Sequence, residues 1–219
     1  MRVKLNSGQG TWLTGVHALV GAAVLLGGAP VQAAVTATES VKGTIAEVLH
    51  ILEDQELKSP GRMEERRHQL EQVIGGRFSY DEMAKRSLGA QWVKLNDKER
   101  QEFVELFRQL LTNSYVGKIE GYSGEQIHYL NERLQDDYAE VRTKITSGKT
   151  EIPLDYRLLK KSGDWRVYDV IVDGISLVNN YRGQFAKIIR SSSYEDLVEK
   201  LRTKSETFAA PKKTDDKAR

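Results

Sequence analysis

Residues 163–185 read Gly-Asp-Trp-Arg-Val-Tyr-Asp-Val-Ile-Val-Asp-Gly-Ile-Ser-Leu-Val-Asn-Asn-Tyr-Arg-Gly-Gln-Phe, and this stretch decides the fold. It predicts a tight turn, a strand rich in β-branched and aromatic residues, a glycine and then a helix. The apolar residues of that helix recur at helical spacing: Leu177, Val178, Tyr181, Phe185 and Ile188. The stretch offers no evident nucleophile, metal ligand or phosphate cradle. It therefore predicts a curved apolar wall with an aromatic lip.

Helices are expected before this stretch. Apolar residues from Val41 to Leu52 line one face of a first helix that ends near Asp54. A second helix begins near Met63 and is expected to close at Gly75-Gly76, because glycine is a poor helix former.

Two further helices carry start signals. Ser79 and Glu82, and again Asn96 and Glu99, have the spacing of a capping box. The first pair predicts a short helix that stops at Gly89, and the second pair predicts the longest helix of the chain. The apolar face of the long helix consists of Phe103, Leu106, Phe107, Leu110, Leu111, Tyr115 and Ile119.

After the long helix the apolar period changes to that of strands. Four strands are expected over residues 126–131, 138–146, 150–160 and 165–172. Tight turns between them predict antiparallel neighbours with one solvated face. Helices followed by a meander and a final helix predict an α+β fold with a four-stranded twisted antiparallel sheet.

The ends of the chain predict export and a tail. Residues 1–33 have a basic start, an apolar run too short to span a bilayer and small residues before Ala34, so we expect a signal peptide cleaved after Ala33. An uncleaved anchor is the alternative. Residues 34–203 are expected to form one domain. Residues 204–219 hold almost no large apolar side chains, which predicts a disordered tail.

The charge and the cysteine content limit the partners and modifications that the chain can have. The formal charge is +2, and Arg2 and Lys4 account for it, so the chain without its leader is near neutral. No basic stripe stands out, which argues against nucleic acid as a partner. The chain contains no cysteine, so it has neither a disulfide nor a lipid-attachment cysteine.

The motifs around the opening stretch resemble a known family, the periplasmic phospholipid-binding component of the Mla lipid-transport pathway, also called the toluene-tolerance family. The matching residues in this half are Gly163, Trp165, Val167, Tyr168, Asp169, Gly174, Ile175, Ser176, Leu177, Val178, Asn180, Tyr181, Arg182 and Phe185. A second block, Arg77 to Ala84 with Leu88-Gly89 and Trp92, is similar to the first half of the family pattern. The resemblance covers residues 40–201.

The resemblance implies a soluble periplasmic carrier whose helices and sheet enclose an apolar lipid cavity. It implies a phospholipid ligand and two membrane-bound partners, an inner-membrane ABC lipid transporter complex and an outer-membrane lipoprotein–porin complex. Shuttling between them would maintain the lipid asymmetry of the outer membrane. Some relatives accompany hopanoid synthesis, so a hopanoid or other polycyclic lipid stays open as the cargo. No cofactor or metal is expected.

A lipid carrier has to enclose acyl tails, because each buried methylene contributes roughly 0.8 kcal/mol. We therefore expect an aliphatic and aromatic wall with no dedicated charged site. The candidate lipid-binding residues are Phe78, Met83, Phe103, Phe107, Leu110, Leu111, Tyr115, Leu154, Tyr156, Leu158, Val167, Ile171, Val178, Tyr181 and Arg182. For each apolar residue the alternative is plain core packing. Arg182 is expected near the mouth, where its guanidinium suits a phosphate.

A small hydrolase or isomerase is the competing function, and a purely structural protein is a third. Gly121 to Glu125 approaches a nucleophile elbow but lacks its last glycine and follows a helix. His50, His68 and His128 show no metal-ligand spacing and are expected to be surface or structural residues.

Tyr168 and Asp169 form the best acid–base candidate. Adjacent strand residues point to opposite faces, so we expect that the two do not line one pocket. Asp169 is expected instead to accept hydrogen bonds from turn amides or to pair with Arg182.

Overall fold

Apolar faces of the expected kind organise the helices in the computed structural model, which describes residues 35–209 and side chains as far as Lys204. The elements before the sheet are α1 (Ala37–Glu53), η1 (Pro60–Arg62), α2 (Met63–Arg77), α3 (Tyr80–Leu88), η2 (Gly89–Lys94) and α4 (Asp97–Glu120). The expected α+β class is confirmed. The boundaries of α1 and α4 also agree with the sequence patterns.

The end of α2 and the start of α3 differ from what the sequence predicts. Helix α2 runs through Gly75-Gly76 and ends at Arg77, so the predicted stop was wrong. Ser79 precedes α3 without capping it, because its hydroxyl donates to Asp81. The second predicted box is present: the Asn96 side chain accepts from the Glu99 amide at 3.0 Å.

The sheet is an antiparallel meander in the order β1-β2-β3-β4-β5. Its strands are β1 (Gln126–Gln135), β2 (Tyr138–Ser147), β3 (Thr150–Lys161), β4 (Asp164–Val172) and β5 (Ile175–Ser176). The sheet therefore has five strands where four were expected. Strand β5 was missed because it is only two residues long. Asp173 and Gly174 both have positive φ, 50° and 78°, and form the tight turn that folds β5 back onto β4.

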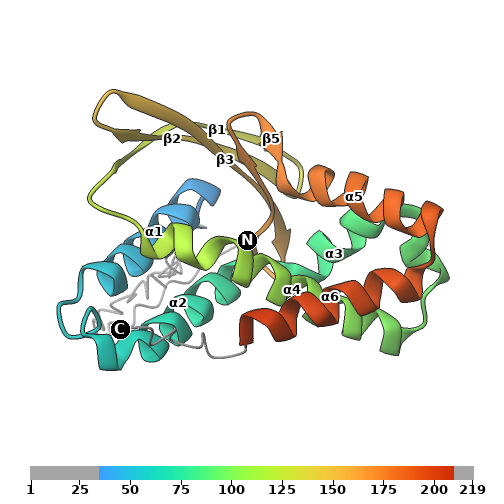
Figure 1. The fold of residues 1–219 in the computed structure, drawn as a ribbon. Coiled ribbons are helices and arrows are strands. Elements are labelled where there is room, and N and C mark those ends of the chain that lie inside the picture. The colour runs from blue at the N-terminus through green and yellow to red at the C-terminus, as the bar shows by residue number, and fades with distance from the viewer. Residues whose placement is uncertain (1–34, 210–219) are drawn as a thin grey trace, which may run out of the picture. The chain divides into compact units, whose positions relative to one another are not determined.

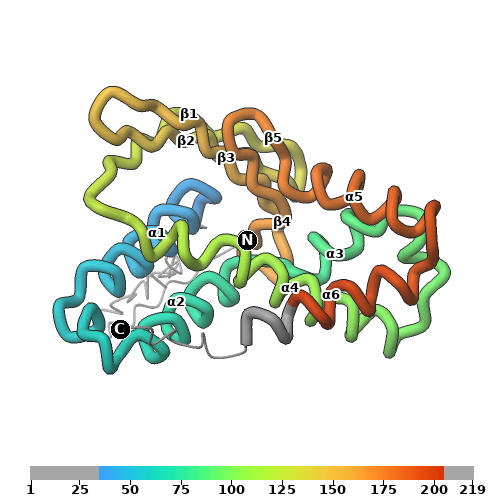
Figure 2. The backbone as a smooth tube through the Cα atoms, in the orientation of Figure 1, coloured from blue at the N-terminus to red at the C-terminus, as the bar shows by residue number. Residues whose placement is uncertain are grey.

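The helices that precede the sheet lie on one face of it, and α5 (Leu177–Ser191) and α6 (Tyr194–Ala209) follow it in the chain (Figure 1). Helices α3, α4, α5 and α6 share one core cluster, which includes Phe103 and Phe107. A second cluster joins α1 to the sheet, and a third holds α1 and α2 together. Figure 2 shows α4 running between the α1–α2 pair and α6. The space between these clusters is where the site lies.

The described region ends within the predicted tail and begins after the predicted signal peptide. Helix α6 continues to Ala209, so residues 204–209 are helical, and the rest of the predicted tail lies outside the described residues. The predicted signal peptide lies outside the described residues. Within residues 35–209, no helix combines the length and the apolar character that crossing a bilayer requires.

Candidate functional site

An apolar cavity of about 250 Å³ lies between α2, α3 and α4 on one side and the sheet on the other. Its lining is Leu70, Glu71, Ile74, Phe78, Tyr80, Met83, Leu111, Thr112, Tyr115, Val116, Ile119, Leu154, Tyr156, Val170, Val172 and Leu177. Only Glu71 carries a formal charge in this set. The cavity is open to the exterior on part of its surface.

The periodicity of helix and strand places these side chains on shared faces that border the cavity. On α4, Leu111, Tyr115 and Ile119 are four residues apart and so share one helix face. On the sheet, Leu154 and Tyr156 of β3, and likewise Val170 and Val172 of β4, alternate onto the same face. One face of α4 and one face of the sheet therefore converge on the hollow.

The buried tyrosines add no charge to the cavity lining. Burial raises the pKa of Tyr80 to about 12, and burial with the neighbouring Tyr181 raises the pKa of Tyr115 to about 12. Burial also raises the pKa of Tyr156 far above the ordinary value for a phenol. Each phenol is thus neutral at physiological pH, and the hollow presents apolar rings and methyl groups to a ligand.

Six of the fifteen candidate residues line this cavity: Phe78, Met83, Leu111, Tyr115, Leu154 and Tyr156. The other nine lie elsewhere. Phe103, Phe107, Leu110, Val178 and Tyr181 are packed in the core shared by α3 to α6. Leu158 and Val167 belong to the core under α1, and Ile171 is buried near the β5 end of β4. Arg182 lines a separate polar groove.

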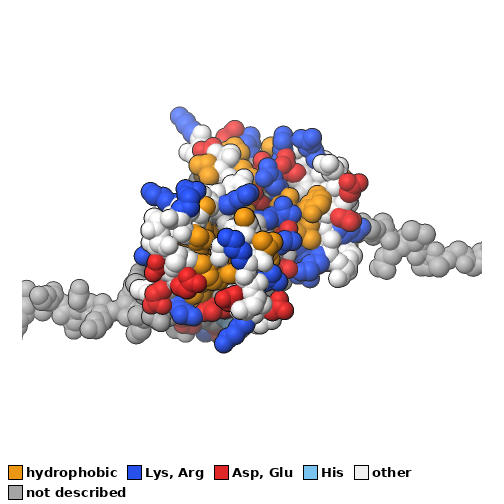
Figure 3. Space-filling model, turned by 90° about the vertical axis from the view of Figure 1, so that its right-hand side faces the viewer, with side chains coloured by type: hydrophobic (Ala, Val, Ile, Leu, Met, Phe, Trp, Pro, Cys, Tyr) orange, Lys and Arg blue, Asp and Glu red, His pale blue; other side chains and the backbone are white. Residues whose placement is uncertain are grey.

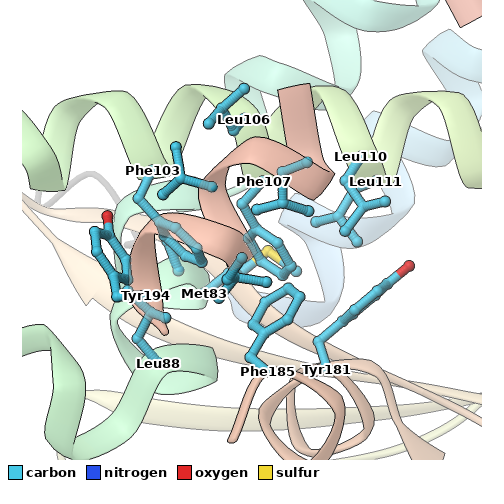
Figure 4. Packing of buried hydrophobic residues seen from close by; sticks show 14 of the residues in the cluster. Met83, Leu88, Phe103, Leu106, Phe107, Leu110, Leu111, Tyr181, Phe185 and Tyr194 are labelled. Carbon is cyan, nitrogen blue, oxygen red and sulfur yellow. The ribbon is translucent and has the colours of Figure 1, made fainter. Parts of the chain in front are cut away.

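Aromatic packing explains why the cavity does not extend along the first half of α4. The Phe103 and Phe107 rings meet the Phe185 ring edge-on, each with 5.7 Å between centroids, and Tyr181 meets Phe107 at 5.4 Å. Figure 4 shows these rings, with Met83 and Leu88, filling the space between the helices. Helix periodicity identifies this inner face but carries no information on whether the space in front of it is filled.

Ten further lining residues were not among the candidates predicted from the sequence: Leu70, Glu71, Ile74, Tyr80, Thr112, Val116, Ile119, Val170, Val172 and Leu177. Several of these residues follow an apolar pattern in the sequence that could have identified them. Leu70 and Ile74 lie on the apolar face of α2, Ile119 continues that of α4, and Val170 and Val172 alternate along β4. No pattern in the sequence could have identified Glu71, because a single acidic residue on a helix of mixed polar and apolar residues usually lies on the surface.

An ion-pair cluster ties α2 to the end of α4 beside the cavity. Arg67 donates from Nε to Glu120 Oε1 at 3.1 Å and from Nη2 to Oε2 at 3.2 Å, and Arg66 Nη2 reaches Oε1 at 3.3 Å. The Glu120 side chain is only 11% exposed. Arg66 Nε is buried with no hydrogen-bond partner. This cluster holds two walls of the cavity together.

Tyr168 and Asp169 do line one hollow, the polar groove between α3, η2, β4 and α5, so the prediction that they cannot was wrong. A register shift in the β3–β4 pairing leaves Tyr168 without a partner between Val167 and Asp169, which breaks the alternation. Asp169 accepts from Ser176 Oγ at 2.6 Å, from the Val178 amide at 3.1 Å and from Arg157 at 3.4 Å. Its predicted bond to a backbone amide is present, and its cationic partner is Arg157, not Arg182.

The remaining sequence candidates for chemistry are surface groups. His50, His68 and His128 are all exposed, and the described residues contain no group of three or more possible ligands that could hold a metal ion. Ser123 bonds to Glu125 in the loop between α4 and β1. None of these groups reaches the cavity.

Comparison with known proteins identifies the family. The family model described as "MlaC protein" matches residues 42–203, which is most of the chain. The chain belongs to the MlaC family.

Two curated relatives of this MlaC-family chain have informative names. The intermembrane phospholipid transport system binding protein MlaC of Haemophilus influenzae is 23% identical over 120 residues, covering 52% of this chain and 56% of that protein. The toluene tolerance protein ttg2D of Pseudomonas putida is 28% identical over 171 residues, covering 76% of this chain and 80% of that protein. The first match thus spans about half of the Haemophilus protein, and the second spans most of its counterpart.

A solved structure supports the fold of this MlaC-family protein. The phospholipid-binding protein from Ralstonia solanacearum, determined in complex with a phospholipid, has a TM-score of 0.70 and 25% identity. The match covers 78% of this chain and 97% of that one. The resemblance inferred from the motifs around Gly163 and Arg77 is confirmed.

Proposed function

We propose that this protein is a phospholipid carrier that holds acyl tails in the cavity between α2, α4 and the sheet. The observation that carries the proposal is the lining, which apart from Glu71 and Thr112 consists of apolar and aromatic side chains. The phospholipid complex of the Ralstonia protein, which shares the fold, supports it. The name of the Haemophilus relative, an intermembrane phospholipid transport system binding protein, also supports it.

The energetics favour tails over headgroup as the recognised part. A two-chain phospholipid has on the order of 30 methylenes, so exposing both tails costs some 20 kcal/mol or more at roughly 0.8 kcal/mol per methylene. Hydrogen bonds contribute about 1 kcal/mol each. A protein that encloses the tails therefore has no need of a charged headgroup site, and Arg182 does not line the cavity.

The cavity has to widen to hold two tails. An apolar cavity of about 150 Å³ holds benzene, which has six carbons, so the 250 Å³ here corresponds to about ten carbons. That is less than one long acyl chain. We infer that α2 moves away from α4 when lipid enters, because ion pairs from Arg66 and Arg67 to Glu120 form part of the closure on that side, next to the packing of Ile119 against the α1–α2 core.

Membership of the MlaC family suggests the cellular role of the carrier. We propose that the leader is removed by export, that the carrier works in the periplasm, and that it exchanges lipid with an inner-membrane ABC transporter complex and an outer-membrane lipoprotein–porin complex. Maintenance of outer-membrane lipid asymmetry is the role this cycle would serve. No step in it requires catalysis by the carrier.

Filling the cavity tests the proposal. Leu154→Trp places an indole among the lining side chains and is expected to reduce copurifying phospholipid at least tenfold with the fold retained. Ile152→Trp, two residues earlier on β3 and 38% exposed, is the matched control and is expected to keep its lipid. Lipid per protein is measured by extraction and mass spectrometry, and folding by circular dichroism. Full lipid retention in Leu154→Trp would refute the proposal.

A further inference from the structure

A second hollow lies on the opposite side of α3 from the cavity. Tyr80 and Met83 of α3 line the cavity, whereas Glu82, Lys85 and Arg86 line a groove of about 460 Å³. The other walls of this groove come from η2, β3, β4 and the first half of α5. The two hollows are therefore separated by one helix, and a ligand in one leaves the other accessible.

The groove has an excess of positive charge. Lys85, Arg86, Arg157 and Arg182 line it, against the carboxylates of Glu82 and Asp169. Both carboxylates already have partners within the protein. Asp169 accepts from Ser176, the start of α5 and Arg157, whereas Glu82 accepts from Arg86 at 2.8 Å and lies 3.6 Å from Lys85 Nζ. Neither is free to neutralise an incoming cation, so the groove favours an anionic ligand.

Arg182 is the cation with unused hydrogen-bonding capacity. Within the described residues its guanidinium has no hydrogen bond or ion pair. It lies against the backbone of Gly89, where an added Cβ would be 3.2 Å from Arg182 Nε and 3.4 Å from Nη2. Gly89 also has a φ of 57°, which favours glycine. The chain thus leaves room for this guanidinium at the groove wall.

Aromatic and apolar groups accompany the charges. The Arg86 guanidinium lies 4.2 Å from the Tyr168 ring centroid, Trp92 is half-buried in the wall, and Val93 at the edge is 76% exposed. Trp, Tyr and Arg are the residues enriched at the centres of protein interfaces. A free phosphate ion would use only the cations and leave this apolar surface unpartnered.

Elsewhere on this side of the molecule the charges are mixed. Figure 3 shows Lys and Arg side chains interspersed with Asp and Glu around small hydrophobic patches on the side where α5 ends and α6 begins. Such a surface produces no extended field of one sign, which a long polyanion would need. Recognition would therefore be confined to the groove.

We propose that this groove is a docking site for an acidic segment of a partner protein, a short stretch in which carboxylates flank an apolar or aromatic side chain. The carboxylates pair with Arg182, and with the exposed Lys85 in place of its 3.6 Å ion pair with Glu82, and the apolar side chain contacts Trp92 and Val93. Docking here leaves the lipid cavity unobstructed because α3 lies between them. The proposal concerns the groove alone and does not depend on the identity of the cargo.

The test uses defined peptides and the purified protein. Fluorescence anisotropy compares a labelled decapeptide with one Trp flanked by four Glu against the same peptide with Gln in place of Glu. We expect the Glu peptide to bind at least tenfold more tightly, and Arg182→Glu to weaken its binding at least tenfold. Arg190→Glu, on the same helix but outside the groove, makes the same change in net charge and is expected to alter binding less than twofold.

The other outcomes contradict the proposal. Equal weakening by Arg182→Glu and Arg190→Glu would show unspecific charge attraction, and failure of the Glu peptide to bind would remove the site. Displacement of the peptide by millimolar inorganic phosphate would show a small-anion site. Self-association that Arg182→Glu abolishes, without peptide binding, would make a second copy of this chain the occupant. Copurified lipid is measured on the same samples, so failure of the carrier function is seen separately.

Discussion

Asp169 shows how one buried side chain joins the sheet to the helix after it. It lies on β4 with its side chain only 4% exposed, and it accepts from Ser176 Oγ and the Val178 amide at the start of α5. A carboxylate at a helix N-terminus satisfies a free amide and complements the helix dipole. The orientation of α5 on the sheet therefore depends on this residue.

Asp169→Asn is expected to destabilise the protein by about 2–3 kcal/mol, because it removes the charge and turns an amide donor toward other donors. Urea unfolding measures the change. Asp155→Asn, on the neighbouring strand β3 and half-buried, is the control and is expected to change stability by less than about 0.5 kcal/mol. Equal effects of the two substitutions would contradict this role for Asp169.

Helix α2 forms one wall of the cavity although its last turn contains two poor helix formers. It contains Gly75 and Gly76 near its end, and a Cβ added at either position would have no neighbouring atom within 4 Å outside its own helix backbone. Leu70 packs in the α1–α2 core, and at the end of the helix Arg77 donates to Thr44, Asp164 and the Trp165 carbonyl, which holds the last turn in place. Tertiary contacts thus outweigh local propensity here.

Gly76→Ala is expected to stabilise the protein by about 0.5–1 kcal/mol, since alanine loses less backbone entropy in a helix and has room at this position. Thermal unfolding of the variant provides the measurement. The same substitution at Gly163, whose φ is 85°, is expected to destabilise the protein. Loss of stability in Gly76→Ala would mean that α2 needs a glycine for a reason outside helix propensity.

Sequence patterns predicted the fold better than the site. The alternation along β2 to β4, the Asn96 capping box and the family motifs around Gly163 and Arg77 led to the correct class and sheet order. The division of α4 did not follow from its sequence. Phe107 and Leu111 are one turn apart and equally apolar, yet Phe107 is in the solid core and Leu111 borders the cavity. That difference depends on Phe185 and Tyr181 of α5, far along the chain.

At the scale of the whole molecule, hollow and solid regions share one apolar interior. The α3–α6 core is filled by aromatic rings, whereas the space between α2, the end of α4 and the sheet is not. An empty apolar cavity costs stability because its lining lacks contacts. A protein that keeps such a cavity is suited to gain stability from an apolar ligand.

The buried phenols make the stability of the whole protein sensitive to alkali. The pKa of Tyr80, Tyr115 and Tyr194 is raised to about 12 in the folded state, and burial is the main cause for each. Their folded pKa exceeds the unfolded value of about 10, so their contribution is complete below pH 10 and is lost as the pH rises toward 12.

We therefore expect the urea midpoint to be unchanged by these groups near neutral pH and to fall between pH 10 and pH 12. Tyrosinate absorbance recorded with circular dichroism follows both events. Tyr80→Phe removes one of these ionisations and is expected to reduce the fall. A midpoint that stays constant to pH 12 would show that the phenols reach solvent in the folded protein.

The central claim, that the cavity between α2, α4 and the sheet carries acyl tails, is tested most directly by native mass spectrometry of the protein purified from its own cell envelope. We predict a protein ion with a bound diacyl phospholipid, identified after extraction, that is absent from Leu154→Trp and present in Ile152→Trp. Protein that is free of lipid in every preparation, or that carries a polycyclic lipid in place of a diacyl one, would contradict the claim.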